Sequence, residues 1–468
     1  MIFSTPIFIV FFLIIILLLY ILKDQKQRQY MLLFASYFFY AYWDCRFLFL
    51  MIFQTFIIYV LALFIDKHKK DNLKLSKRYL SLGITISLLI LSVFKYYNFF
   101  IDTINIFLQD HTLENVHIIL PLGISFYIFQ SMSYLIDVYR DEEQAQTSFL
   151  KVSLYISFFP QMVAGPIVRA KEFLPQLETN PPLKIANISA GLQIFLFGLF
   201  KKVVIADNLS VFVDQVFETP AVFDSITIIL AVISYSIQIY CDFSGYSDMA
   251  IGVAMCMGYK LVVNFNMPYL APNPTDFWRR WHISLSTWLK DYLYVPLGGS
   301  YKGAYRTNIN LMITMLLGGL WHGASWNFVV WGAIHGIALI IHKLFKSLKL
   351  FDGEKIFVKI LFVVFNYLFV CSAWIFFRAE DFNTAIIIFE KIVYFSHYGV
   401  SQTFLYSIIF IPFFFIVHLF VFFRNKSEGF YIIKDYNKLS TKILISLVIL
   451  LIICFGYTSS SPFIYFQF

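Results

Sequence analysis

The sequence is poor in charged residues. Asp, Glu, Lys and Arg make up 14% of its 468 residues, against about 25% in an ordinary globular domain. Hydrophobic residues reach 59%, so a soluble form of the chain would expose large apolar patches. Disordered chains are rich in charge and poor in apolar residues, which excludes disorder. The composition predicts an integral membrane protein with many spans.

Cysteine is scarce as well. The five cysteines are odd in number and scattered through apolar segments, which excludes a disulfide scaffold. The chain also lacks Cys-x-x-Cys, His-Glu-x-x-His, a Gly-x-Ser-x-Gly elbow, a Walker loop and the dinucleotide glycine fingerprint. We therefore expect no bound metal and no bound cofactor.

The net charge of +8 is unevenly distributed. Lys and Arg gather in residues 66–78, 343–359 and 424–442, whereas residues 102–117 carry acidic side chains and no Lys or Arg. Cytoplasmic loops of membrane proteins are enriched in Lys and Arg, so the basic segments are expected inside and both chain ends outside. No aromatic-interleaved basic module accompanies the charge, so we expect no nucleic-acid partner.

A helical span needs about 20 mostly apolar residues, and candidate apolar stretches recur along the chain. Residues 31–65 are too long for one span and are interrupted at residues 43–46, so two helices are expected there. The other candidates are residues 5–22, 79–100, 118–138, 152–168, 185–205, 226–257, 326–342, 357–377, 404–423 and 443–457. The sequence predicts an all-α polytopic membrane protein with about eleven transmembrane helices. One membrane domain (residues 1–457) is followed by an extracytoplasmic aromatic tail (residues 458–468).

Residues 273–293 have the pattern of an amphipathic helix. Asn273 suits the N-cap and Pro274 the first helical position. One stripe is aromatic and apolar: Trp278, Trp281, Leu285, Trp288 and Tyr292. A second stripe is polar: Arg279, His282, Ser286 and Lys290. The pattern predicts a helix at the membrane interface, where it would contact lipids. A simple interfacial anchor does not explain a histidine among the cations.

Residues 317–336 place two histidines in an apolar, glycine-rich segment. His322 follows Gly318 and Gly319, and His335 lies further along the same segment. An ionisable group inside a membrane is costly and indicates a functional role. Imidazole can accept and return a proton near neutral pH. At both positions a hydrogen-bonded core histidine is the alternative, and His335 is either a partner of His322 or a packing residue.

Two motifs carry a family resemblance. Phe-Trp-Arg-Arg-Trp-His from residue 277 and Gly-Gly-Leu-Trp-His-Gly from residue 318 strongly resemble the membrane-bound O-acyltransferase family, and most of all its alginate O-acetyltransferase branch. The resemblance extends over the chain through residues 33–43, 121–127, 164–167 and 242–252. It implies a multi-pass protein of the bacterial cytoplasmic membrane, with a tilted ring of helices around a central tunnel and additional interfacial helices.

The resemblance also implies roles for individual residues. It makes His322 the catalytic residue and His282 a second functional position. Trp321 and His335 are our own candidates for supporting neighbours. We expect His322 to deprotonate a hydroxyl and then protonate a thiolate leaving group. Arg279, Arg280 and Lys290 would hold anionic groups of the donor or of lipid headgroups.

The activity implied is acetyl transfer from a cytoplasmic thioester, expected to be acetyl-CoA, toward an extracytoplasmic polysaccharide. Alginate-like exopolysaccharide and peptidoglycan are both candidate acceptors, and a separate serine-esterase-like O-acetyltransferase outside the membrane is the expected partner. Two alternatives stay open. One is D-alanyl transfer to envelope polymers, and the other is a lipid or acyl transporter without catalysis.

The C-terminal tail (residues 458–468) ends in an almost wholly aromatic run. Such a run is expected to be buried, because exposure to water is costly. It either packs on neighbouring helices or enters the outer mouth of the tunnel. The run resembles the C-terminal motif of the small membrane partner in teichoic-acid D-alanylation, and by that resemblance Tyr465 would carry the acyl group. A phenol has a pKa near 10, so it would need a base such as His322.

Overall fold

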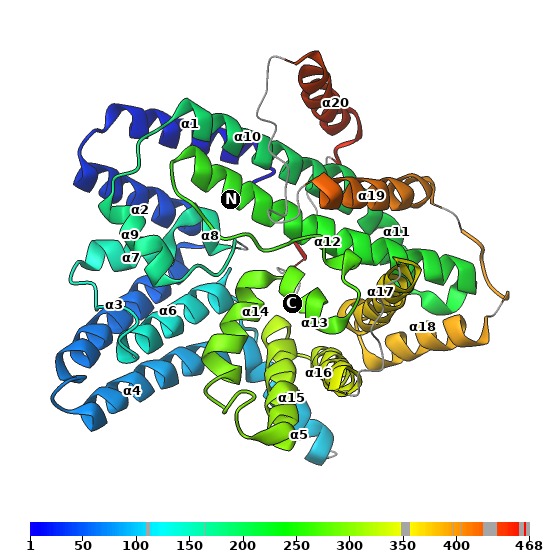
Figure 1. Cartoon of the computed structure of the whole chain (residues 1–468), viewed down its shortest axis with the longest axis horizontal. Helices are drawn as coiled ribbons and strands as arrows, with labels where there is room; N and C mark the ends of the chain where they lie inside the picture. Colours follow the sequence, from blue (N-terminus) through cyan, green and yellow to red (C-terminus); the bar gives the residue numbers. More distant parts are fainter. Residues whose placement is uncertain are drawn as a thin grey trace. The chain divides into compact units, whose positions relative to one another are not determined.

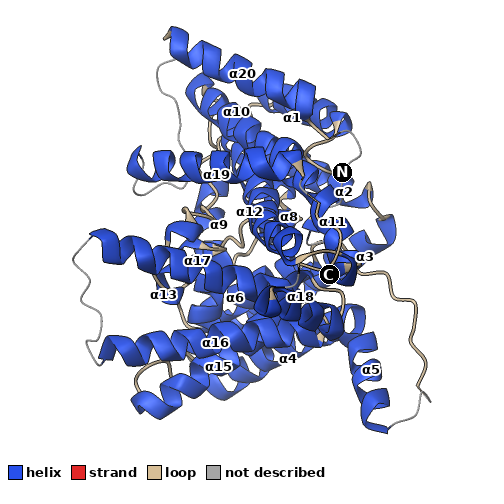
Figure 2. Cartoon of the chain, turned by 90° about the vertical axis from the view of Figure 1, so that its right-hand side faces the viewer, coloured by secondary structure: helices blue, strands red, loops and turns tan. Residues whose placement is uncertain are grey.

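A computed structural model describes residues 1–108, 113–163, 165–347, 356–395, 397–402, 404–424, 438–457 and 463–464. Within these ranges the regular elements are helices, with one isolated bridge between Phe223 and Val400 (Figure 2). This confirms the all-helical prediction. The chain divides into two compact units: Met1–Phe195 with Met249–Val262, and Leu196–Asp248 with Val263–Phe468.

The first unit contains the N-terminal helices (Figure 1). They are α1 (Pro6–Ile21), α2 (Gln25–Ala41), α3 (Cys45–His68), α4 (Leu73–Leu91), η1 (Ser92–Tyr96), α5 (Tyr97–Leu108), α6 (Ile124–Tyr139), α7 (Phe149–Ser157), α8 (Phe159–Met162) and α9 (Ala170–Glu178). Two long helices, α10 (Ile185–Phe200) and α12 (Ser225–Cys256), have residues in both units.

The second unit carries both histidine motifs. Its further elements are η2 (Lys201–Ala206), α11 (Asp207–Glu218), η3 (Pro220–Val222), η4 (Pro268–Leu270), α13 (Pro274–Arg280), α14 (Ile283–Leu289), η5 (Lys290–Tyr294), α15 (Gly303–His322), α16 (Trp326–Ser347), α17 (Ile356–Arg378), α18 (Phe382–Tyr394), α19 (Leu405–Arg424) and α20 (Leu439–Phe455).

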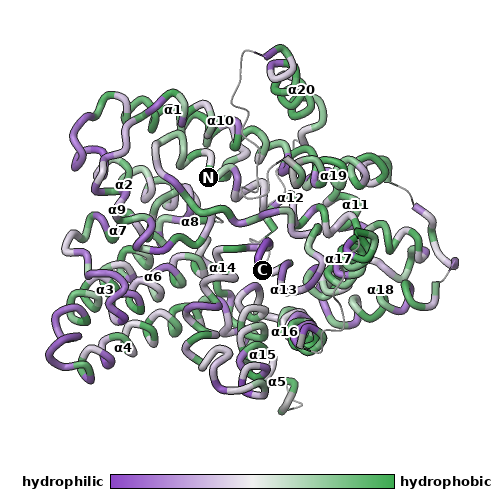
Figure 3. Tube along the Cα trace, in the orientation of Figure 1, coloured by the Kyte–Doolittle hydropathy of each residue, from purple (hydrophilic) through white to green (hydrophobic). Residues whose placement is uncertain are grey.

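Six helical stretches in the described residues are long and apolar enough to cross a membrane. They are Cys45–His68, Leu73–Ile106, Ile185–Glu218, Ser225–Cys256, Trp326–Lys346 and Ile356–Arg378. Three shorter apolar helices, α1, α19 and α20, accompany them. Figure 3 shows α17, α19 and α20 hydrophobic along most of their length. The chain is a multi-pass membrane protein, and the count of eleven spans stays a prediction.

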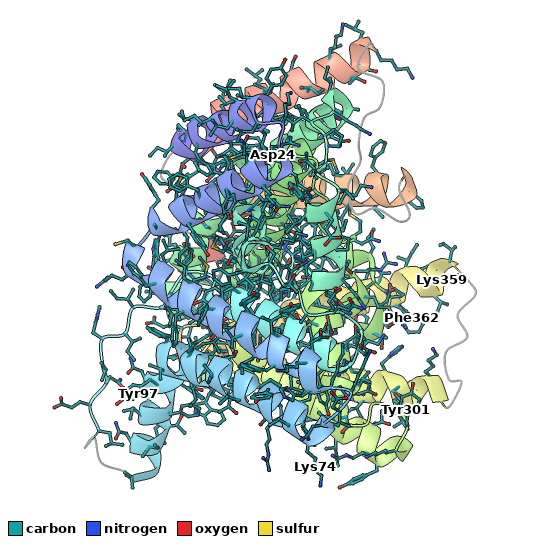
Figure 4. All side chains as sticks on the ribbon, turned by 90° about the vertical axis from the view of Figure 1, so that its left-hand side faces the viewer. Asp24, Lys74, Tyr97, Tyr301, Lys359 and Phe362 are labelled. Carbon is teal, nitrogen blue, oxygen red and sulfur yellow. The ribbon has the colours of Figure 1, made fainter. Side chains whose placement is uncertain are left out.

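Basic side chains near helix ends project away from the protein. Lys74 at the start of α4 and Lys359 near the start of α17 are exposed and point outward (Figure 4). Long cationic side chains in such positions reach from an apolar helix toward water or headgroups. Their positions fit helices that end near the membrane surface.

The prediction of two helices in residues 31–65 is confirmed. α2 ends at Ala41 and α3 begins at Cys45. The Asp44 side chain accepts the Arg46 N–H at 2.9 Å. Asp is a preferred N-cap residue because its carboxylate accepts an N–H left unsatisfied at the helix start.

The predicted span over residues 152–168 is wrong. α7 ends at Ser157, and the four-residue α8 follows after Phe158. Pro160 suits the first turn of α8, where a missing N–H costs nothing. The Gln161 amide donates to the Tyr155 carbonyl at 2.6 Å, which satisfies an acceptor freed by the break.

The predicted span over residues 118–138 starts too early. α6 begins at Ile124, directly after Gly123 in the left-handed conformation with φ of 68°. A Cβ at Gly123 would also overlap the Met162 carbonyl. The turn at Gly123 therefore needs a residue without a side chain, and it sets the start of the helix.

The helix α15 was not predicted as a separate element, although it carries His322. It packs along α16, and both views show the two helices side by side (Figure 1, Figure 2). A Cβ at Gly319 of α15 would overlap the Phe328 carbonyl, and one at Gly332 of α16 would overlap the Met315 carbonyl. Small residues allow this close backbone approach between membrane helices.

Replacing Gly319 with Leu should lower the free energy of unfolding by about 1–3 kcal/mol, because the added side chain forces α15 and α16 apart. Thermal unfolding in detergent micelles measures the change. Leu317→Ala is the control, since Leu317 lies on the same helix and is 45% exposed. An unfolding temperature of Gly319→Leu equal to that of the control would contradict the close packing.

Candidate functional site

His282 lies at a break between two short helices. α13 ends at Arg280 and α14 begins at Ile283, and His282 adopts the left-handed conformation with φ of 42° and ψ of 56°. The prediction of one continuous amphipathic helix is therefore wrong. Its start is confirmed, because the Asn273 side chain accepts the Asp276 N–H at 2.9 Å and Pro274 is the first helical residue.

A neighbouring segment of the same unit causes the break. The Asn266 N–H donates to the Arg280 carbonyl at 2.9 Å, and the Ile283 N–H donates to the Asn264 carbonyl at 2.9 Å. The Asn264 side-chain oxygen accepts the Ser284 N–H at 3.2 Å. Backbone groups that an uninterrupted helix would pair internally thus find partners in residues 264–266.

The break separates the predicted polar stripe. His282 is fully buried, whereas Arg279 and Lys290 are exposed. Arg280 Nε donates to the Asp276 carboxylate at 2.7 Å. The cations therefore do not share the environment of His282. Burial lowers the pKa of His282, which lies outside the six spanning stretches, to about 3, so its imidazole is neutral at pH 7.

His322 is the last residue of α15 and is 2% exposed. Its ring centroid lies 6.3 Å from that of His282. The Trp321 ring lies 5.9 Å from His282 and 5.1 Å from His322. The structure thus brings together three residues from the two motifs, although 39 sequence positions separate His282 from Trp321.

Aromatic rings from other helices complete the surroundings of His322. The ring centroids of Trp331 on α16 and Phe377 on α17 lie 5.0 Å and 5.3 Å from the centroid of the His322 ring. Trp331 also contacts the His335 ring at 4.8 Å. His335 is fully buried.

The tail of the chain reaches this region. Phe243 of α12 lies 4.6 Å from the His282 ring, and Phe463 lies 5.8 Å from Phe243. Phe463 and Ile464, the tail residues that the structure describes, are 0% and 3% exposed. Tyr465 lies outside the described residues.

Three site residues were not anticipated. Trp331 belongs to the histidine-rich segment 317–336, so its proximity could have been suspected. Phe243 lies in the stretch 242–252 that carries the resemblance, but nothing in its spacing pointed to His282. Phe377 on α17 had no signal at all.

The site suits proton transfer in an environment with little water. Two imidazoles lie close together, and aromatic rings pack against them. In the part of the chain that the structure describes, no three His, Cys, Asp or Glu side chains converge as metal ligands. The chemistry available from the residues present is general acid–base catalysis by imidazole.

Comparisons with known proteins match most of the chain. Residues 7–380 match the profile of the membrane-bound O-acyltransferase family. The chain is 38% identical over 464 residues to a probable alginate O-acetylase of Pseudomonas putida, with 93% of each chain covered. It is 40% identical over 386 residues to a peptidoglycan O-acetyltransferase of Helicobacter pylori, with 77% of this chain and 72% of the relative covered.

A more distant relative is named for D-alanyl transfer. A teichoic acid D-alanyltransferase of Bacillus subtilis is 26% identical over 277 residues, with 56% of this chain and 69% of the relative covered.

The burial of His282 predicts a stability change with pH. Its pKa falls from the usual 6.5 to about 3 on folding. Its effect on stability is therefore small above about pH 6.5, and protonation of the unfolded chain removes stability as pH falls from 6.5 toward 3. At pH 5 the loss is about 2 kcal/mol. We expect His282→Asn, which tolerates a left-handed backbone, to lose less stability than the wild type between pH 7 and pH 5.

Thermal unfolding in detergent at the two pH values measures this difference. His397→Asn, at an exposed loop position, is the control and should follow the wild type. Identical pH dependence in wild type and His282→Asn would disprove the prediction.

Proposed function

Because the chain belongs to the membrane-bound O-acyltransferase family, we propose that it moves an acetyl group from a cytoplasmic thioester toward an extracytoplasmic polysaccharide. The relatives at 38–40% identity are named for acetylation of alginate and of peptidoglycan, which supports acetyl as the group and a cell-envelope polymer as the final acceptor. D-alanyl transfer is the second candidate, and the 26% relative supports it less. Membership of an acyltransferase family argues against a transporter without catalysis.

The observation that carries the proposal is the enclosed pair of imidazoles, with ring centroids 6.3 Å apart. In the proposed reaction His322 accepts the proton of a hydroxyl as its oxygen attacks the thioester carbonyl. The C–S bond then breaks, and His322 returns the proton to the thiolate, which leaves as a thiol. His282, neutral and buried, orients the reacting groups without adding charge.

The exposed cations have a separate role in this proposal. Arg279 and Lys290 are free to reach phosphate groups of a lipid or of acetyl-CoA, the proposed donor, at the protein surface. Arg280 fixes α13 through Asp276.

We also propose the tilted ring of helices with a central tunnel, with residues 1–457 as one membrane domain and both chain ends on the extracytoplasmic side of the cytoplasmic membrane.

We further propose Tyr465 as the first acceptor. Its phenol oxygen would take the acetyl group, and the aryl ester would pass the group on to a serine-esterase-like transferase outside the membrane. The neighbouring residues Phe463 and Ile464 are buried, and Phe463 contacts Phe243 beside His282. An aryl ester keeps the acetyl group activated, which suits a relay.

Replacing His322 with Ala should lower acetyl transfer at least about 10²-fold, because the proton acceptor and donor is lost. Transfer of radiolabelled acetyl to the cell envelope measures the effect, with expression checked by immunoblot. His397→Ala, at an exposed position, should leave transfer unchanged. Transfer by His322→Ala at the level of this control would refute the catalytic role.

Tyr465→Phe should abolish acetylation while leaving the amount of folded protein unchanged, because only the phenol oxygen is removed. The base-labile acetate of the envelope polymers is the readout. Tyr457→Phe is the matched control, since it removes a phenol next to the tail. Wild-type acetate in the Tyr465→Phe strain would exclude the relay.

A further inference from the structure

A buried charged cluster lies in the second unit beside the histidine site. Lys202 Nζ on η2 lies 2.8 Å from Asp207 Oδ1 and 2.6 Å from Asp242 Oδ1 on α12. We call these three residues the Lys202 cluster. The side chains are each at most 6% exposed. Buried charges cost free energy unless they are paired and hydrogen-bonded, so the cluster needs an explanation.

The cluster has more acceptor than donor capacity. Two carboxylates face one ammonium group, and each carboxylate can accept several hydrogen bonds. The second oxygen of Asp242, Oδ2, accepts the main-chain N–H of Ile464 at 2.8 Å. The tail thus supplies a donor to a carboxylate that lies 222 residues earlier in the chain.

The side chain of Phe463, the residue before Ile464, packs on α12, the helix that contains Asp242. The Phe463 ring lies 4.8 Å from Tyr246 and 5.8 Å from Phe243. Phe243 in turn lies 4.6 Å from His282. The aromatic contacts and the hydrogen bond therefore hold Phe463 and Ile464 on the face of α12 that borders the histidine site.

The helix before the tail is held on neighbouring residues. The Tyr457 N–H donates to the Val203 carbonyl of η2 at 2.9 Å. The Asn208 side chain donates to the Phe455 carbonyl at 2.8 Å. η2 is a π-helical turn, and such turns are often found at functional sites. The end of α20 is therefore bonded to η2 and to the start of α11. The same turn, η2, contains Lys202, which pairs with Asp242.

We propose that the Lys202 cluster is the docking point of Phe463 and Ile464 in the C-terminal tail, and that Asp242 contributes to acyl transfer by holding the Ile464 main chain. Asp242 is a positioning residue in this inference. Lys202 and Asp207 keep its carboxylate oriented so that Oδ2 faces the tail. The inference adds to the proposed function. The contribution of Asp242 to acyl transfer rests on that function, whereas the docking at the Lys202 cluster does not.

The chain offers a matched control for the cluster. Lys201 Nζ lies 2.6 Å from Asp248 Oδ2, and this ion pair joins the same two elements, η2 and α12. Its removal disturbs the contact between η2 and α12 without removing the acceptor of the Ile464 N–H. A purely structural role of Asp242 would make Asp242→Ala and Asp248→Ala behave alike.

The first experiment measures docking without any need for activity. The full chain carries Ile464→Cys, and the two exposed cysteines, Cys45 and Cys454, are replaced with Ala. The rate of maleimide labelling at position 464 is then compared in detergent. We expect Asp242→Ala to raise the rate at least about tenfold, because a hydrogen bond to a charged acceptor shifts an equilibrium by that order. Asp248→Ala should leave the rate unchanged.

The second experiment removes the donor and leaves the cluster intact. Ile464→Pro deletes the N–H, whereas Ile464→Ala retains it. In acetyl transfer by the full chain we expect Ile464→Pro to lower kcat at least about tenfold more than Ile464→Ala does. The KM for the thioester donor should be equal in both variants, because the tail positions the acceptor side.

The outcomes separate the inference from the function on which it rests. Equal labelling in Asp242→Ala and Asp248→Ala, or equal kcat in Ile464→Pro and Ile464→Ala, overturns the docking role. If the wild type transfers no acyl group at all, the proposed function fails, while the labelling rates still decide whether Asp242 holds the tail. Faster labelling in Asp242→Ala, together with a lower kcat in Ile464→Pro than in Ile464→Ala, supports both the docking and the positioning role of Asp242.

Discussion

Enclosure of two buried imidazoles by aromatic rings is the constraint that shapes the second unit. Rings from several helices pack around the two imidazoles and keep them buried. Trp331 and Phe377 pack on His322, while Phe243 packs on His282. The close approach of α15 and α16 through glycines keeps His322 against Trp331. Loss of any of these contacts would admit water, which competes for the proton that acyl transfer has to move.

The sequence predicts a helix start that depends on neighbouring residues, but not a break that depends on contacts distant in the chain. Asn273 and Pro274 determine a helix start through their own side chains, so the start of α13 could be predicted. The break at His282 depends on Asn264 and Asn266, and helical periodicity carries no information about such partners. The resemblance singled out His282 and His322, whereas their proximity and the enclosing Phe243 and Phe377 required the fold.

The Lys202 cluster shows the same limit for charges. Asp242 begins the stretch 242–252 that carries the family resemblance, and nothing in that stretch indicates its ionic partner. The counterpart, Lys202, lies on a different helix and in a π-helical turn. Residue spacing predicts neither that the Lys202 side chain points toward Asp242 nor that it is buried. The breaks at Phe158 and Gly123 likewise depend on contacts of the folded chain, such as the fit of Gly123 against the Met162 carbonyl.

The attachment of α20 to η2 has a consequence for affinity. A free peptide with the same end would lose about 4–15 kcal/mol of translational and rotational freedom on binding, and one hydrogen bond contributes far less. The covalent connection from Tyr457, already held at Val203, replaces that loss by the smaller entropy of closing a short loop. A single contact such as the hydrogen bond between Ile464 and Asp242 is then sufficient to hold Ile464 in place.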